Sequence, residues 1–424
     1  MKSKIVNYLC VVMFMSLCIL TGCGQNKAEE SNMQKETNQK TVSEVTSTKE
    51  PVQTVAPMTE KEQIYFDMLE RSVLSTGNNE RMKRAMEKAQ KGEDVTLAYI
   101  GGSITQGYNA GTTEIFAKLS SDYFRDTYAT TGKVNYVNAG LSGTPSLLGL
   151  IRCERDILEA KPDVVFIEFA VNDAQDTMSI SAFESLVRKV LKQEQDPAVV
   201  LLFSMTEDGY TCQNTMQVIG MNYDLPMISV PNALKPEFEA GRMKWADWAD
   251  DGSHPNQDGQ KLYSEYIIHY FQKVEKEEVS EPYVLLEKMM NLDYTSMKML
   301  DKTSLTVLEQ GSFHEESAHD SFPNGWVKSA DATENLPFVF EIDCRSLFFV
   351  YKEANNESYG TAEVYVDGEK VYTISSNKAD GWYNPVPVRI YKGSDCQKRK
   401  VEIKMQEGDE AKTFSLLAIG YCVE

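Results

Sequence analysis

Leu97-Ala-Tyr-Ile-Gly-Gly-Ser-Ile-Thr-Gln-Gly107 is the stretch of sequence that decides the fold. Four apolar residues lead into a pair of glycines, and a serine follows at once, ahead of residues that suit a helix. Glycine permits a tight turn and keeps the approach to a neighbouring side chain open. The stretch therefore predicts a buried strand, a sharp turn, and the hydroxyl of Ser103 displayed at the start of a helix.

A glycine-rich turn after a strand is also typical of phosphate-binding loops. Such a loop ends in Gly-Lys followed by Ser or Thr, whereas Gly107 is followed by Tyr108. We therefore interpret Ser103 as a nucleophile, because the residue types that activate a serine occur further along the chain.

Short apolar runs alternate with segments of helical spacing on both sides of this stretch. The runs do not alternate internally, which is typical of strands buried on both faces of a parallel sheet. They cover residues 95–100, 134–137, 164–169, 198–203 and 227–230. This order predicts an α/β domain over residues 61–275, with a parallel sheet between helical layers. In such a sheet, ligands bind beyond the carboxyl ends of the strands.

The stretch Asp251-Gly-Ser-His-Pro255 offers a base for Ser103. Histidine suits a general base because its ordinary pKa lies near working pH, and an acid three residues earlier can orient the ring. We expect His254 to be the base and Asp251 the acid. Asp250 and Asp247 are alternative acids, and a calcium-binding turn is the alternative interpretation of this acidic loop.

Two further positions can donate hydrogen bonds to a developing oxyanion. The turn Asn138-Ala-Gly-Leu-Ser-Gly143 offers the unobstructed backbone N–H of Gly143, and Asn172 offers a side-chain amide after a predicted strand. Alone, the Asn172-Asp173 pair is most often a turn or a helix cap. We interpret Gly143 and Asn172 as oxyanion donors only because Ser103 and His254 occur in the same chain.

These blocks resemble those of the SGNH, or GDSL-type, hydrolase superfamily over roughly residues 95–271. The resemblance implies a flavodoxin-like three-layer fold and ester hydrolysis without a metal or other cofactor. It also implies that Ser103 is the nucleophile, His254 the base and Asp251 the orienting acid. The oxyanion donors that it implies are the Ser103 N–H, Gly143 and Asn172.

Two positions depart from the pattern of the superfamily. Gly102 replaces the usual aspartate before the serine, and Ala170 stands where a glycine is usual, two residues before Asn172. Neither change removes a chemical group from the mechanism. Both indicate a divergent subgroup.

The N-terminus reads as an export signal. Lys2 and Lys4 precede a short apolar core, and Leu20-Thr-Gly-Cys23 resembles a bacterial lipobox. We expect residues 1–22 to be a lipoprotein signal peptide and Cys23 to be lipidated. Residues 23–60 are polar, which predicts a disordered tether. The expected location is the outer face of a bacterial membrane, with the lipid as the only membrane contact.

The composition excludes some partners and metal sites. The net charge of −20 over 424 residues argues against nucleic acid as a partner. No cysteine spacing is typical of a metal site, so no metal is expected. Among the last three cysteines, Cys344, Cys396 and Cys422, one disulfide remains open.

The pattern changes to short β-type runs after residue 305. Residues 276–304 read as a connector with some helix, and Asp367-Gly368 is a hairpin signal between two runs. Residues 305–424 therefore predict a β-sandwich. This segment resembles the jelly-roll accessory domains of carbohydrate esterases in the superfamily. Trp326 and Trp382 lie in its predicted loops, where they would contact sugar or pack in the core.

The function that we expect is removal of acyl groups, above all acetyl groups, from a polysaccharide or oligosaccharide at the cell surface. Trp245 and Trp248, just before the acidic loop, are candidates for stacking on sugar, with core packing as the alternative. An O-acyltransferase or a lipid esterase on the same machinery is the rival enzyme. A catalytically inactive carbohydrate-binding lipoprotein is the rival non-enzyme.

Overall fold

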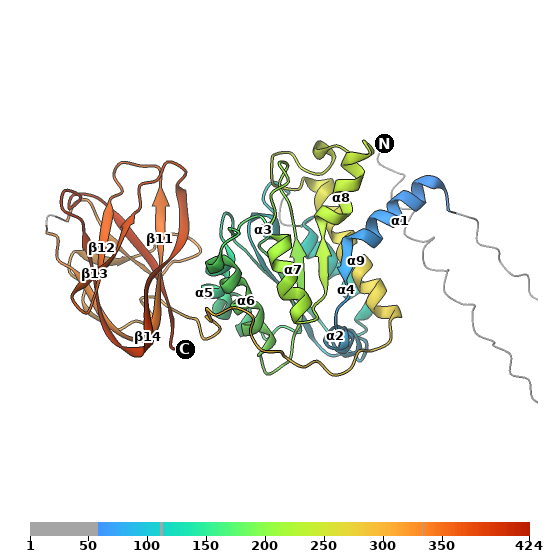
Figure 1. Cartoon of the computed structure of the whole chain (residues 1–424), viewed down its shortest axis with the longest axis horizontal. Coiled ribbons are helices and arrows are strands. Elements are labelled where there is room, and N and C mark those ends of the chain that lie inside the picture. Colours follow the sequence, from blue (N-terminus) through green and yellow to red (C-terminus); the bar gives the residue numbers. More distant parts are fainter. Residues whose placement is uncertain (1–57, 111–112, 333) are drawn as a thin grey trace, which may run out of the picture. The chain divides into compact units, whose positions relative to one another are not determined.

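The computed structural model describes residues 58–110, 113–332 and 334–424 (Figure 1). Within it, Phe66–Glu424 form one compact unit. The signal peptide, Cys23 and all but the last three residues of the tether lie outside the described residues. Of the helices that are described, none is long and apolar enough to cross a membrane.

The first domain is built on a six-stranded sheet in the order β1-β6-β5-β4-β2-β3. Its strands are β1 (Val73–Ser75), β2 (Val95–Gly101), β3 (Val134–Gly140), β4 (Val164–Glu168), β5 (Ala198–Phe203) and β6 (Met227–Ser229). All neighbours pair in parallel except β1, which runs antiparallel to β6 at the edge. The predicted parallel sheet is confirmed, and β1 is an addition that the sequence did not predict.

Helices cover both faces of this sheet (Figure 1). They are α1 (Glu60–Ser72), α2 (Glu80–Gln90), α3 (Ser103–Gln106), α4 (Phe116–Tyr128), α5 (Ser146–Asp156), α6 (Thr177–Leu191), α7 (Gln213–Asn222), α8 (Val230–Glu239) and α9 (Gln257–Lys276). Alternate residues of each strand point to opposite faces. Ile100 joins the core shared with α5, α6 and α7, and Tyr99 joins the core shared with α2, α4, α8 and α9. The predicted three-layer α/β architecture is therefore confirmed.

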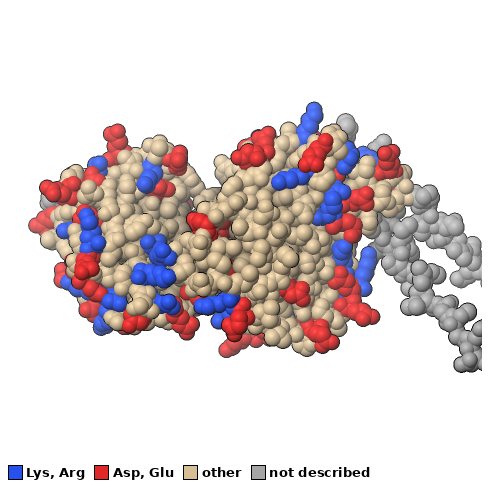
Figure 2. All heavy atoms as spheres, viewed as in Figure 1, with Lys and Arg blue, Asp and Glu red and all other residues tan. Residues whose placement is uncertain are grey.

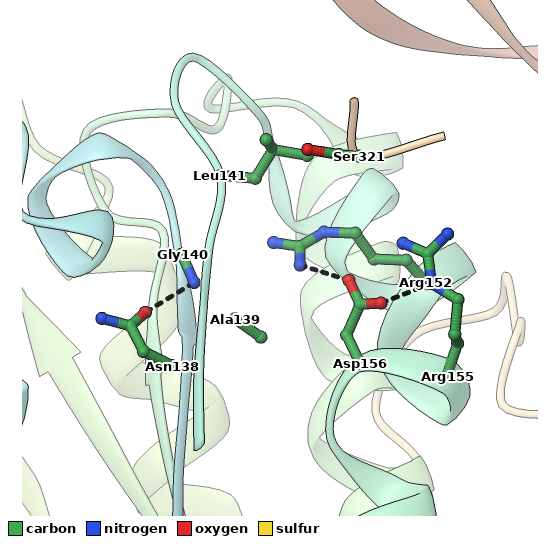
Figure 3. Close-up of a pocket in the computed structure, with 8 residues that line it drawn as sticks. All are labelled: Asn138, Ala139, Gly140, Leu141, Arg152, Arg155, Asp156 and Ser321. Carbon is green, nitrogen blue, oxygen red and sulfur yellow. Dashed lines mark hydrogen bonds and ion pairs between the residues drawn. The ribbon is translucent and has the colours of Figure 1, made fainter. Parts of the chain in front are cut away.

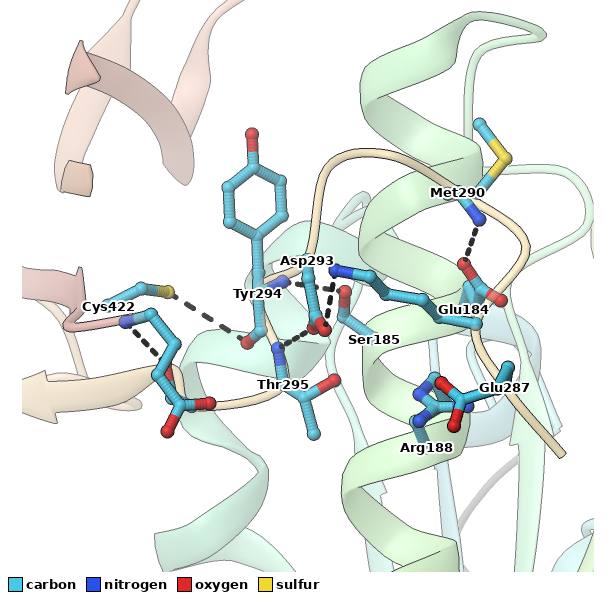
Figure 4. Close-up of polar contacts among 12 residues, drawn as sticks. Glu184, Ser185, Arg188, Glu287, Met290, Asp293, Tyr294, Thr295 and Cys422 are labelled. Atoms are coloured by element: carbon cyan, nitrogen blue, oxygen red, sulfur yellow. Dashed lines mark hydrogen bonds and ion pairs between the residues drawn. The ribbon is translucent and has the colours of Figure 1, made fainter. Parts of the chain in front are cut away.

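The connector after α9 lies along helix α6 without forming a helix of its own (Figure 4). The Glu184 carboxylate accepts hydrogen bonds from the backbone N–H groups of Met289 (2.6 Å) and Met290 (2.8 Å). Ser185 Oγ accepts another from Tyr294 N–H (2.9 Å). The expected connector helix is wrong, because side chains of α6 take up backbone donors that a helix would use internally.

The C-terminal domain is an antiparallel β domain. Its strands are β7 (Lys298–Leu300), β8 (Val307–Glu309), β9 (Phe313–Glu316), β10 (Gly325–Lys328), β11 (Phe338–Ala354), β12 (Thr361–Val366), β13 (Glu369–Ser375), β14 (Trp382–Met405) and β15 (Phe414–Cys422). They enclose an apolar core that includes Trp326, which is fully buried. Because β7 pairs with β15, the β domain begins a few residues before position 305.

The structure tests two local predictions for the β domain, a hairpin at Asp367-Gly368 and a disulfide. Asp367 and Gly368 both have positive φ, as the predicted hairpin between β12 and β13 requires. Cys344, Cys396 and Cys422 are free thiols, so the disulfide left open above is not formed.

The two domains share apolar contacts. Leu148 and Ile151 of α5 belong to the same buried cluster as Phe348 of β11 and Leu417 of β15. On the face drawn in Figure 2, Lys and Arg are interspersed with Asp and Glu over both domains. The two domains therefore share one buried cluster. The face drawn in Figure 2 has no large surface of a single charge.

Candidate active site

Ser103, His254 and Asp251 lie in one hydrogen-bonded row. Ser103 begins α3 directly after β2 and the Gly101-Gly102 turn. Its Oγ lies 2.9 Å from Nε2 of His254, and His254 Nδ1 lies 2.8 Å from Asp251 Oδ2. With the Nδ1 proton donated to Asp251, Nε2 is an acceptor for the proton of the Ser103 hydroxyl. The fold thus brings together residues 151 positions apart.

Asp251 is the acid that contacts the histidine. Burial alone would raise the pKa of Asp251, but hydrogen bonds from His254 N–H, the His254 ring and Ser253 N–H outweigh it and lower that pKa. Asp250 instead accepts from Asn256 Nδ2 (3.3 Å), and Asp247 accepts from Lys244 N–H (2.8 Å). The two alternative acids are therefore occupied elsewhere.

The turn at Gly143 and the side chain of Asn172 face the same region as the Ser103 turn. A Cβ atom placed on Gly102 would lie 2.1 Å from Asn172 Oδ1, so in this structure the Asn172 amide would have to shift to admit a side chain at position 102. In the described chain, neither Ser103 N–H nor Gly143 N–H donates to another residue. Both are available to an oxyanion.

Asp173 ties the two oxyanion segments together. Its buried carboxyl accepts hydrogen bonds from Ser146 N–H (2.7 Å) and Ser146 Oγ (2.6 Å), at the start of the helix that follows the Gly143 turn. Burial raises the pKa of Asp173 to about 7. The Asn172-Asp173 pair therefore supplies one possible donor and one structural anchor.

The aromatic candidates separate clearly. Trp248 is 1% exposed and packs against Tyr263, so its interpretation as a sugar-contacting residue is wrong. Trp245 is partly buried, and its indole N–H donates to the backbone oxygen of Asp251 (2.6 Å). Trp245 thus supports the loop that carries the acid. In the sequence, Trp245 and Trp248 lie between predicted elements, where no hydrophobic pattern distinguishes a buried tryptophan from one that supports a loop.

Trp382 of the β domain reaches the oxyanion turn. It is 52% exposed, and a Cβ atom on Gly143 would lie 2.7 Å from its indole ring. The next residue, Tyr383, has φ of 70°, a conformation that costs a non-glycine residue energy and often marks a functional corner. The sequence singled out Trp382 but not its proximity to Gly143, because that contact joins two domains.

A polar cavity of 350 Å³ lies beside the segment that leads to Gly143 (Figure 3). Arg152 spans it, donating to Asp156 Oδ2 (2.7 Å) and to the backbone oxygen of Gly101 (3.3 Å). Its lining residues are Asn138, Ala139, Gly140, Leu141, Arg152, Arg155, Asp156 and Ser321. None of the Ser103-His254-Asp251 row lines this cavity, and Arg152 at its wall holds the backbone of Gly101, just before the nucleophile turn.

Glu168 is a buried acid directly behind the nucleophile turn. It is fully buried at the end of β4, in register with Gly101, and Thr105 Oγ1 of α3 donates to its Oε2 (3.1 Å). Burial raises the pKa of Glu168 to about 7. The sequence gave no signal for this residue, which lies inside an apolar strand.

Glu168→Gln is expected to make the stability of the protein less dependent on pH. The ordinary pKa is 4.5 and the folded-state pKa is about 7, so the wild type loses stability as pH rises between these values. Glutamine does not titrate and can still accept from Thr105. We expect Tm of the variant minus Tm of the wild type to increase from about pH 5 to about pH 8. A difference that stays constant over this range would contradict the role of burial.

In the part of the chain that the structure describes, no three His, Cys, Asp or Glu side chains cluster so that they could hold a metal ion. The arrangement has the parts of a serine hydrolase: a hydroxyl, an imidazole, an orienting carboxylate and amide donors.

The class defined by this fold and site agrees with the sequence relatives of the chain. Residues 99–262 match the GDSL-like Lipase/Acylhydrolase family. The chain is also 23% identical over 188 residues to thioesterase 1/protease 1/lysophospholipase L1 of Escherichia coli (strain K12), covering 42% of this chain and 83% of that protein. The first domain therefore resembles GDSL-type hydrolases, which supports an esterase or acylhydrolase.

Solved structures extend the likeness to both domains. The chain is similar to a two-domain esterase (CEX) active on acetylated mannans, with a TM-score of 0.76, 26% identity, and coverage of 84% of this chain and 98% of that one. The same kind of esterase co-crystallized with mannopentaose gives a TM-score of 0.75 and 27% identity, with the same coverage. The chain thus resembles a carbohydrate esterase in its fold and its two-domain organisation.

Proposed function

We propose that the protein is a serine esterase that removes acetyl groups from a polysaccharide of the mannan type or from its oligosaccharides. The observation that carries the proposal is the hydrogen-bonded row Ser103-His254-Asp251, together with the indole of Trp382 from the second domain, which lies against the Gly143 turn. The similarity of both domains to an esterase active on acetylated mannans supports the choice of substrate.

The reaction begins when His254 Nε2 takes the proton of Ser103 and Oγ attacks the ester carbonyl. Charge that develops on the carbonyl oxygen is stabilised by the N–H groups of Ser103 and Gly143 and by the Asn172 amide. His254 then returns the proton to the sugar oxygen as the C–O bond breaks. Water, activated by the same imidazole, releases acetate from Ser103, while Asp251 orients the ring and stabilises its charged form.

The substrate is tested by measuring release of the carboxylic acid from a defined set of esters: acetate from the acetyl esters and the longer fatty acid from the others. The set comprises acetylated mannan, acetylated xylan, a lysophospholipid and acyl esters of increasing chain length. We expect the highest kcat/KM for the acetylated glycans, with acetylated mannan first. Highest activity on the lysophospholipid or the long acyl esters would instead support a lipid esterase, the candidate that the Escherichia coli relative favours.

Trp382→Ala is expected to reduce action on glycan esters selectively. An exposed indole beside an oxyanion donor offers a flat apolar surface for a sugar ring. We expect the ratio of kcat/KM on acetylated mannan to kcat/KM on ethyl acetate to fall by about tenfold, which corresponds to roughly 1.4 kcal/mol.

Tyr372→Ala, at an exposed aromatic on β13, is the matched control and should leave this ratio unchanged. If Trp382→Ala also leaves the ratio unchanged, the second domain does not contribute to substrate selection through this residue.

A further inference from the structure

Tyr108 places a second exposed aromatic ring at the site, next to the base. Its ring centroid lies 4.6 Å from that of His254, at an interplanar angle of 48°, and the residue is 52% exposed. It follows α3 directly, after Gly107 at φ of 88°. Its N–H donates to the backbone oxygen of Ser103 (3.0 Å). The backbone of Tyr108 is therefore tied to the nucleophile turn, and its ring packs against the base.

The neighbouring residue makes this placement more rigid. Asn109 has φ of 67°, a left-handed conformation that asparagine tolerates better than most residues. Its side-chain amide donates to Asp251 Oδ2 (3.2 Å), the same oxygen that contacts His254 Nδ1. In the turn that follows α3, Tyr108 thus packs against the base and Asn109 bonds to the acid.

The direction of proton transfer from His254 indicates which half of the ester lies next to Tyr108. His254 must give its proton to the leaving oxygen, so the alcohol half of the ester lies on the imidazole side of the site. The carbonyl oxygen points instead toward Gly143 and Asn172. A ring that packs against His254 and is more than half exposed therefore borders the leaving alcohol.

We propose that Tyr108 binds the sugar ring that carries the ester and so helps to select acetylated sugars. The inference rests on the proposed function and adds a binding residue on its leaving-group side. An aromatic face packs against the C–H groups of a pyranose ring, and the phenol hydroxyl is a donor and acceptor for sugar hydroxyls. A role confined to holding His254 would not require the exposed face.

The test compares Tyr108→Leu, Tyr108→Phe and the wild type on two acetyl esters. One is an acetylated manno-oligosaccharide, and the other is ethyl acetate, whose alcohol has no ring. For Tyr108→Leu we expect the ratio of kcat/KM on the sugar ester to kcat/KM on ethyl acetate to fall by about tenfold or more. Tyr108→Phe, which keeps the ring, should restore most of this ratio.

The outcomes separate the two proposals. If Tyr108→Leu lowers both activities by the same factor, Tyr108 acts only by positioning His254, and the inference is wrong. If it changes neither activity, the ring has no role in the site and the inference is also wrong. If the wild type hydrolyses ethyl acetate but none of the acetylated sugars, the proposed function fails and takes the inference with it.

Discussion

Ser103→Ala is expected to reduce kcat for acetyl ester hydrolysis by about five to six orders of magnitude, because the variant lacks the atom that attacks the carbonyl. Ser103 Oγ lies 2.9 Å from His254 Nε2, the ring nitrogen that does not contact Asp251. The oxyanion donors remain in place and leave a small residual rate. The measurement is steady-state hydrolysis of ethyl acetate by the purified full-length variant.

Two controls make this result interpretable. An unchanged Tm and circular dichroism spectrum would show that the variant is folded, and Ser394→Ala, at an exposed serine of β14, should keep the wild-type rate. A Ser103→Ala variant with a rate close to that of the wild type would rule out Ser103 as the nucleophile.

His254→Ala is expected to be nearly as damaging, since it removes both the base that activates Ser103 and the acid that protonates the leaving oxygen. Asp251→Asn should cost less, on the order of two to four orders of magnitude in kcat, because Asp251 orients and stabilises the imidazole without touching the substrate. Both variants are measured on the same ester as Ser103→Ala.

Asp250→Asn is the matched control for the acid. Asp250 is next to Asp251 in the chain but bonds to Asn256, away from the imidazole. We expect its kcat to stay within about threefold of the wild type, since surface substitutions away from special features have small effects. A larger loss in Asp250→Asn than in Asp251→Asn would show that the acid has been misassigned.

The sequence was sufficient to predict those parts of the fold and the site that depend on residues close together in the chain. Unalternating apolar runs predicted the parallel strands, as β2 and β4 show, since only strands covered on both faces carry such runs. The glycine pair before Ser103 predicted the turn. Asp251 and His254, three residues apart in one loop, required no knowledge of tertiary structure to be paired.

Features that depend on contacts between distant segments were beyond the sequence. Trp248 and Trp382 both lie outside the elements that the sequence predicts, yet one is buried by α9 and the other lies against Gly143 of the other domain. The connector lacks a helix because Glu184 takes up its backbone donors. The sequence predicted no helix over residues 230–239, where α8 forms with Pro231 in its first turn, a position at which proline is tolerated.

The most direct test of the account is acetate release from a purified acetylated manno-oligosaccharide by the wild type and by Ser103→Ala, measured side by side. We expect the wild type to release acetate and the variant to release it about five to six orders of magnitude more slowly. Equal release by both proteins would contradict the assignment of Ser103. Absence of release by a wild type that hydrolyses long acyl esters would contradict the carbohydrate substrate.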